Sequence, residues 1–203
     1  MNSIYLQGIV IGLASLAPIG LQNLFVINSA ISLSRARAFF TALIVGCFDI
    51  TLTSSCFFGV GALIDRFYFV KLAVLLIGSL VVFKIGLSLL KAKCADSSSR
   101  ITCSIKGTVA TAFVVTWFNP QALIDCSLML GAIHATLVSS DLIPFVSGLY
   151  TASFAWFIGL FAVISIIRNR FSQKSILIIN RCCAVVILLY SFKLMYEFVA
   201  ILA

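Results

Sequence analysis

Long uncharged runs separated by short polar segments dominate the hydrophobic pattern of this chain. A membrane-spanning helix requires roughly 20 predominantly apolar residues, and six stretches meet or approach that length. The six windows cover residues 4–29, 39–63, 69–90, 108–133, 143–167 and 177–200. The fifth window carries no charge and is the clearest span, whereas the sixth contains Arg181, Lys193 and Glu197. The pattern predicts an all-α integral membrane protein with six transmembrane helices.

The composition agrees with this reading. The chain is 62% hydrophobic and only 10% charged, whereas a soluble domain has about a quarter of its residues charged. The net charge of +8 comes from basic residues in short clusters between apolar runs, not from a basic stripe with interleaved aromatic residues. We therefore expect the bilayer, and not a nucleic acid, as the partner of this surface.

The basic residues predict an orientation. The connections after the first, third and fifth windows hold nine lysines and arginines, whereas the opposite connections hold only Arg66 and Lys71. Because basic residues accumulate in cytoplasmic loops, these three connections are expected in the cytoplasm, with both termini outside.

The polar segment 91–107 divides the chain into residues 1–90 and 108–203, with three predicted spans in each part. An odd number of spans per half gives the halves opposite orientations, as in the inverted repeats of secondary transporters. A weak sequence similarity between the halves supports a repeat: Pro18 precedes Asn23 by five residues, and Pro120 precedes Asp125 by five.

The fourth window contains the segment TWFNPQALID, residues 116–125. Asparagine favours the N-cap of a helix and proline the position after it, so a new helix is expected to start after Asn119. A helix start offers free N–H groups and a partial positive charge to an anion, and Asp125 suits an ammonium group. A plain proline kink is the alternative.

Asp49 and Asp125 lie deep in their windows, where an acidic residue costs roughly 2.5–3.5 kcal/mol. Such residues normally mark an ion or substrate path. The alternative is a structural ion pair of these carboxylates with Lys84, Arg181 or Lys193.

The first window contains a face of small residues and, after it, two helix-breaking residues. Small residues recur at helical spacing, which favours close helix packing. Pro18 and Gly20 then loosen the regular helix just before two amide side chains. The small residues are Gly8, Gly12 and Ser15, and the amides are Gln22 and Asn23. Amides at this depth bond across helices or line a polar path.

No cofactor or metal site is expected. The seven cysteines form no CxxC pair and are interpreted as small packing residues. His134, the only histidine, is expected at a membrane boundary. The chain contains no P-loop, which argues against ATP-driven transport.

Several of these motifs resemble the LysE family of amino-acid exporters. They are YLQGIVIGLASLAPIGLQNLFVIN at residues 5–28, CFDITL around Asp49, TWFNPQALID, and ASFAWFIG at residues 152–159. The resemblance implies six helices in two inverted halves, and the paired amides point to the lysine/arginine branch. Two positions depart from the family pattern: Leu21 replaces Pro or Ala, and Gln121 replaces the branch's histidine.

We therefore expect a multi-pass secondary transporter of the bacterial inner membrane, and not an enzyme, that exports arginine or lysine in exchange for protons. A homo-oligomer is compatible with this reading. An exporter of neutral amino acids such as threonine, homoserine or leucine is the main alternative, and a non-transporting membrane subunit is a weaker one. The expected substrate- and ion-binding residues are Asp49, Asp125, Asn119, Gln22, Asn23 and Gln121, with Pro18, Gly20 and Pro120 as hinge positions.

Overall fold

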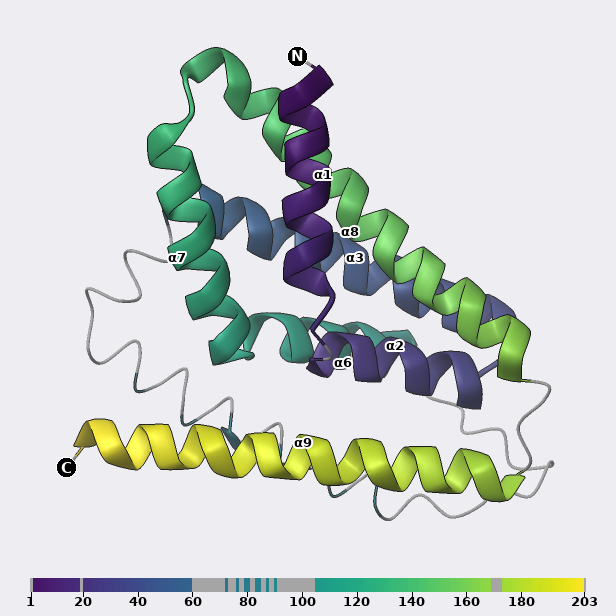
Figure 1. Ribbon diagram of the computed structural model, residues 1–203. Coiled ribbons are helices and arrows are strands. Elements are labelled where there is room, and N and C mark those ends of the chain that lie inside the picture. Colours follow the sequence, from purple (N-terminus) through teal and green to yellow (C-terminus); the bar gives the residue numbers. More distant parts are fainter. Residues whose placement is uncertain are drawn as a thin grey trace.

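The described part of the chain folds into α-helices joined by short turns (Figure 1). The computed structural model describes residues 2–18, 20–59, 105–168 and 173–202, together with single positions between 72 and 90. For Pro120, Gln121, Ile124, Asp125 and part of the last helix, only the backbone is described. The helices are α1 (Asn2–Leu16), α2 (Leu21–Ser32), α3 (Arg35–Phe57), α6 (Ile105–Trp117), α7 (Pro120–Thr136), α8 (Ser139–Ile167) and α9 (Gln173–Leu202).

The first predicted window, 4–29, is not one continuous helix. Helix α1 ends at Leu16 and α2 begins at Leu21, with the two axes bent by 78°. Figure 1 shows α1 crossing the direction of α2 at a steep angle. Proline has no N–H to continue the hydrogen-bond ladder, and Pro18 lies inside this break, as does Gly20. The expected loosening is therefore a full break.

The fourth window is interrupted as well, between Trp117 and Pro120. Asn119 occupies the N-cap of α7 with extended backbone angles (φ −100°, ψ 94°), and its side chain accepts a hydrogen bond from the Ala122 N–H at 3.4 Å. Pro120 takes the first helical position, where its missing N–H is of no consequence.

Two described helices, α3 and α8, are long and apolar enough to cross a bilayer, and the bent pair α1 and α2 makes a third candidate. Helix α6 and the segment Cys126–Thr136 of α7 are shorter apolar helices. The third window, 69–90, lies mostly outside the described residues. The arrangement of six spans in two inverted halves therefore remains a prediction.

Helices α8 and α3 make most of the contacts between the described helices. Helix α8 contacts α1, α2 and α3, while α6 and α7 lie against α3. At the far end of α8, Arg168 donates to the carbonyl oxygens of Ala30 (3.2 Å) and Leu33 (2.8 Å), so that it caps the end of α2. Basic groups at a helix C-terminus are favourable for this reason.

The contact between α1 and α8 depends on the predicted small-residue face. A side chain at Gly8 would meet the Phe145 carbonyl oxygen, and one at Gly12 would meet the Ala152 methyl group at 2.6 Å. Gly148 faces Gly8 across the same contact. The two backbones approach closely because none of these glycines carries a Cβ.

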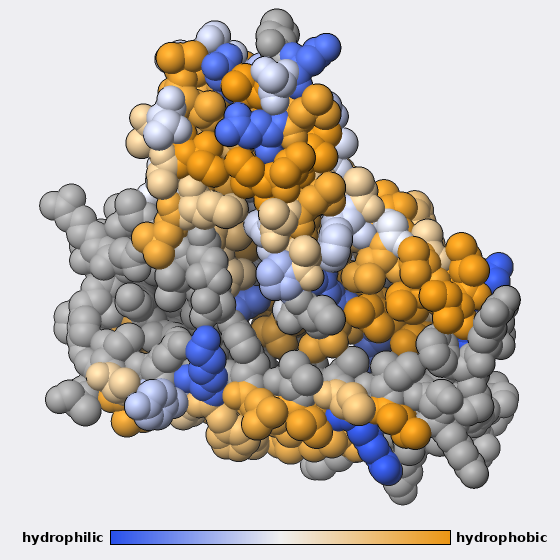
Figure 2. Space-filling model, viewed as in Figure 1, coloured by the Kyte–Doolittle hydropathy of each residue, from blue (hydrophilic) through white to orange (hydrophobic). Residues whose placement is uncertain are grey.

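The outer surface is that of a membrane protein. Figure 2 shows hydrophobic side chains over much of the described surface of α8 and α9. Ile143 and Ile166 on α8 are 81% and 74% exposed, and Tyr196 on α9 is 74% exposed. Exposed apolar area on this scale indicates contact with lipid.

The glycine contact yields a stability prediction. In Gly148→Ala the added methyl group meets the Tyr5 carbonyl oxygen, so the folded state should lose about 1–3 kcal/mol, as in other overpacked sites. Gly159→Ala on the same helix adds its methyl group to open space and serves as the matched control. Thermal unfolding in detergent measures both, and equal midpoints for the two variants would contradict the close contact.

Candidate functional site

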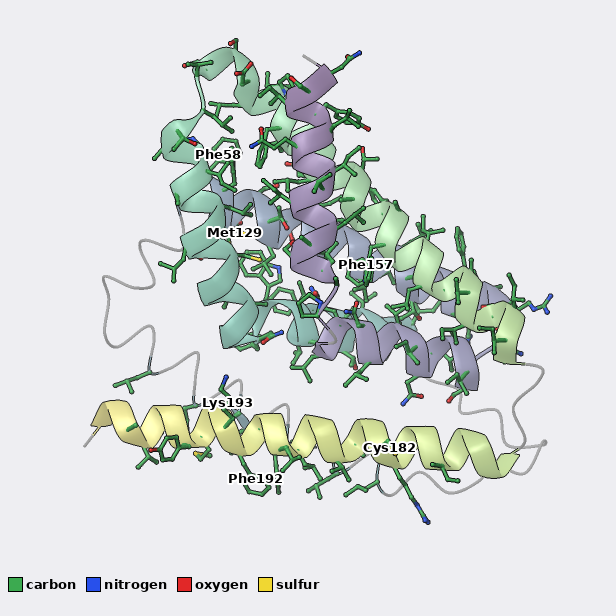
Figure 3. All side chains as sticks on the ribbon, in the orientation of Figure 1. Phe58, Met129, Phe157, Cys182, Phe192 and Lys193 are labelled. Atoms are coloured by element: carbon green, nitrogen blue, oxygen red, sulfur yellow. The ribbon has the colours of Figure 1, made fainter. Side chains whose placement is uncertain are left out.

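A cavity of about 460 Å³ lies between the two helix breaks. This volume falls within the range of roughly 300–1,000 Å³ that is typical of small-molecule sites. Its polar wall comes from both breaks and from α3 and α8. The residues of this wall are Ser15, Gln22, Asn23, Asp49, Thr53, Asn119 and Ser153. Apolar side chains of Leu52, Met129, Leu130 and Leu149 complete the lining, and Figure 3 shows Met129 between α7 and α1.

Asp49 supplies the negative charge of this wall. Its side chain is 5% exposed and lies on α3 between Val45 and Leu52, which belong to separate hydrophobic clusters. Gln22 Nε2 donates to Oδ1 at 3.2 Å, and Ser153 Oγ donates to Oδ2 at 2.6 Å. Both partners are neutral, and the described residues show no ion pair of Asp49 with Lys84, Arg181 or Lys193.

Asn23 holds the first break together. Its amide nitrogen donates to the carbonyl oxygens of Leu16 (2.9 Å) and Pro18 (3.0 Å), just where α1 ends. Its amide oxygen accepts a hydrogen bond from the indole N–H of Trp156 on α8 at 2.9 Å. Carbonyls at a broken helix end must find partners inside a membrane protein, and this single amide supplies both.

Two helix starts border the same cavity. Gly20 is the N-cap of α2. Because glycine has no side chain, it makes no capping hydrogen bond to the first N–H groups of this helix. Residues 20–23 at this start line the cavity, as do Asn119 and Ala122 at the start of α7. The N-terminal ends of two helices, which carry a partial positive charge, therefore border the same cavity as the Asp49 carboxylate.

The structure brings together six of the positions predicted from the sequence. Pro18, Gly20, Gln22, Asn23, Asp49 and Asn119 all border the cavity. Asp125, Gln121 and Pro120 belong to the first turns of α7, but their side chains lie outside the described residues. Their assignment to the site remains a prediction.

Two polar residues of the site were missed by sequence reasoning. Ser153 and Trp156 lie three residues apart on α8 and so share one face of that helix. One contacts Asp49 and the other Asn23. The signal was a serine and an indole N–H on the same face of one helix, within the segment ASFAWFIG that carries the family resemblance.

These features define a class of protein: an α-helical membrane protein with a polar cavity at two interrupted helices. The chain belongs to the family of LysE type translocators, which it matches over residues 13–198. Translocators move their substrates and are not enzymes.

Individual relatives extend the match to nearly the whole chain. The arginine exporter protein ArgO of Salmonella enteritidis PT4 is 31% identical over 98% of this chain and 97% of its own length, and that of Salmonella typhi matches to the same extent. No solved structure matches the chain.

The Asp49 contacts generate a second stability prediction. Ser153→Ala removes the 2.6 Å hydrogen bond to a buried carboxylate, and hydrogen bonds to charged groups contribute about 1.5–3 kcal/mol. Ser147→Ala is the control, because the Ser147 hydroxyl donates only to the Pro144 carbonyl of its own helix. Unfolding midpoints should fall clearly for Ser153→Ala alone, and a control that falls as far would contradict the special role of Ser153.

Proposed function

We propose that this protein exports amino acids across the bacterial inner membrane, and that its substrates are arginine and lysine. Two lines of support converge. The relatives that match nearly the whole chain are named arginine exporters, and the cavity offers groups of opposite charge to one small molecule.

The cavity itself carries the proposal. An amino acid presents a carboxylate and an ammonium group, and the two helix starts suit the first while Asp49 suits the second. A basic side chain adds a second cation. We assign it to Asp125, which follows the start of α7 by about a turn and a half, with Gln121 as a hydrogen-bonding neighbour.

Energetics require that export be coupled. Moving one cation outward against an inside-negative potential costs about 2.3 kcal/mol per 100 mV, so an uncoupled path would let arginine leak inward. Exchange for a proton supplies the driving force. Asp49 and Asp125 then alternate between the substrate cation and a proton as the two halves of the chain expose the cavity to each side in turn.

The position of the breaks supports two related halves. Each half of the sequence has an interrupted first window, formed by α1 and α2 in window 4–29 and by α6 and α7 in window 108–133. Discontinuous helices at a central binding site are typical of transporters built from inverted repeats.

Export of neutral amino acids is the competing function. The observation in its favour is the apolar lining by Leu52, Met129, Leu130 and Leu149, which would suit an aliphatic side chain. A non-transporting subunit would leave the cavity and its carboxylate without a purpose.

Dipeptide feeding separates these functions. Cells that lack the protein are supplied with dipeptides containing arginine, lysine, threonine or leucine, and the free amino acids inside are measured. The proposal predicts excess arginine or lysine in the deletion strain, reversed when the protein is restored. An excess confined to threonine or leucine would assign the protein to neutral amino acids.

The same assay tests the role of Asp49. Asp49→Asn removes the negative charge but keeps the shape, and arginine efflux should fall by at least about tenfold, as expected from loss of one charge-assisted contact. Asp141→Asn is the control, because Asp141 lies in the first turn of α8 and is absent from the cavity lining. Efflux at the wild-type rate by Asp49→Asn would remove Asp49 from the mechanism.

A further inference from the structure

We propose that Trp156 is a positioning residue: through the Asn23 amide it fixes the break between α1 and α2 and so presents the start of α2 to the cavity. This inference rests on the proposed function only in treating the cavity as the substrate site. It also changes the role of Asn23, which the sequence pointed to as a substrate-binding residue.

The amide of Asn23 has no donor left for a substrate. An asparagine side chain offers two N–H donors and one carbonyl oxygen. Both donors are used by the carbonyl oxygens of Leu16 and Pro18, and the oxygen accepts the indole N–H of Trp156. Because Asn23 is 5% exposed, these bonds are shielded from competing solvent.

Trp156 and the two carbonyls together fix which way this amide faces. An indole N–H can only donate and binds the oxygen side of the amide, while the two backbone carbonyls can only accept and bind its nitrogen side. With the amide reversed, its oxygen would face two other oxygens, and the end of α1 would lose both partners. The hydrogen bond from α8 thus specifies the local structure of a break that is 133 residues away in sequence.

The consequence reaches the charged centre of the site through Gln22. This residue precedes Asn23 at the start of α2, and its amide donates to Asp49 at 3.2 Å. Ser153, one turn before Trp156, donates to the other carboxylate oxygen. One face of α8 therefore binds both the Asn23 amide at the helix break and the Asp49 carboxylate. If the backbone at the break became more mobile, the groups that contact the substrate would be displaced.

Transport kinetics provide the first test. Trp156→Phe keeps an aromatic ring and removes only the N–H, and we expect the KM for arginine efflux to rise roughly 3- to 10-fold with little change in kcat. The matched control is Trp117→Phe, which removes an indole N–H that donates to Thr51 Oγ1 at 3.3 Å outside the cavity lining.

A second pair of variants tests the amide. Asn23→Asp replaces the NH₂ group by an oxygen that repels the two carbonyls, and it should raise KM further than Trp156→Phe does. Asn28→Asp on the same helix is its control, since the Asn28 side chain only accepts a bond from Ser32. In an Asn23→Ala background, adding Trp156→Phe should cause no further change, because the two residues act as one unit.

Hydrogen–deuterium exchange of the purified protein gives a readout that does not need transport. Trp156→Phe should speed exchange in residues 17–24 relative to the wild type, whereas Trp117→Phe should not. Unchanged exchange there, or equal KM values for the two tryptophan variants, would overturn the inference. A wild type that exports neither arginine nor lysine, combined with faster exchange in Trp156→Phe, would instead refute the proposed function and leave the positioning role standing.

Discussion

The structure of this translocator depends on one requirement: backbone groups exposed by a broken helix must be bonded inside the protein. The two breaks meet it in different ways. At the first, Asn23 binds the carbonyls that α1 leaves open at its end. At the second, Asn119 accepts an N–H at the start of α7. Side chains thus stabilise the non-helical backbone at both breaks, and the helix starts at these breaks border the cavity.

A buried carboxylate next to these breaks gives the site its chemical character. A charge with no counterion is costly in a low-dielectric interior, and the two neutral donors on Asp49 reduce this cost without cancelling the charge. What they leave is an attraction for a cation. Because two helix starts border the same space, the cavity is complementary to a small molecule that carries both charges, and this complementarity links the fold to the proposed export of amino acids.

Local chemistry made much of this arrangement predictable. Pro18 and the Asn119–Pro120 pair marked both breaks, and the small residues on α1 marked its packing face. The 78° bend was not predictable, because it depends on the packing of α1 and α2 against α8. The neutral partners of Asp49 were also hidden, since Ser153 is 104 residues away and periodicity does not show which helix faces face each other. For the same reason, the hydrogen bonds of Asn23 to Trp156 and to the Leu16 and Pro18 carbonyls could not be predicted.

The most direct test of the account is whether arginine occupies the cavity. Cys126 lines it, whereas Cys103 belongs to the polar segment 91–107, so the wild-type protein contains both a reporter and a control. Alkylation by a small maleimide, followed residue by residue with mass spectrometry, should slow at Cys126 as arginine is added and stay constant at Cys103. Equal alkylation of Cys126 with and without saturating arginine would contradict the central claim that this cavity binds the substrate.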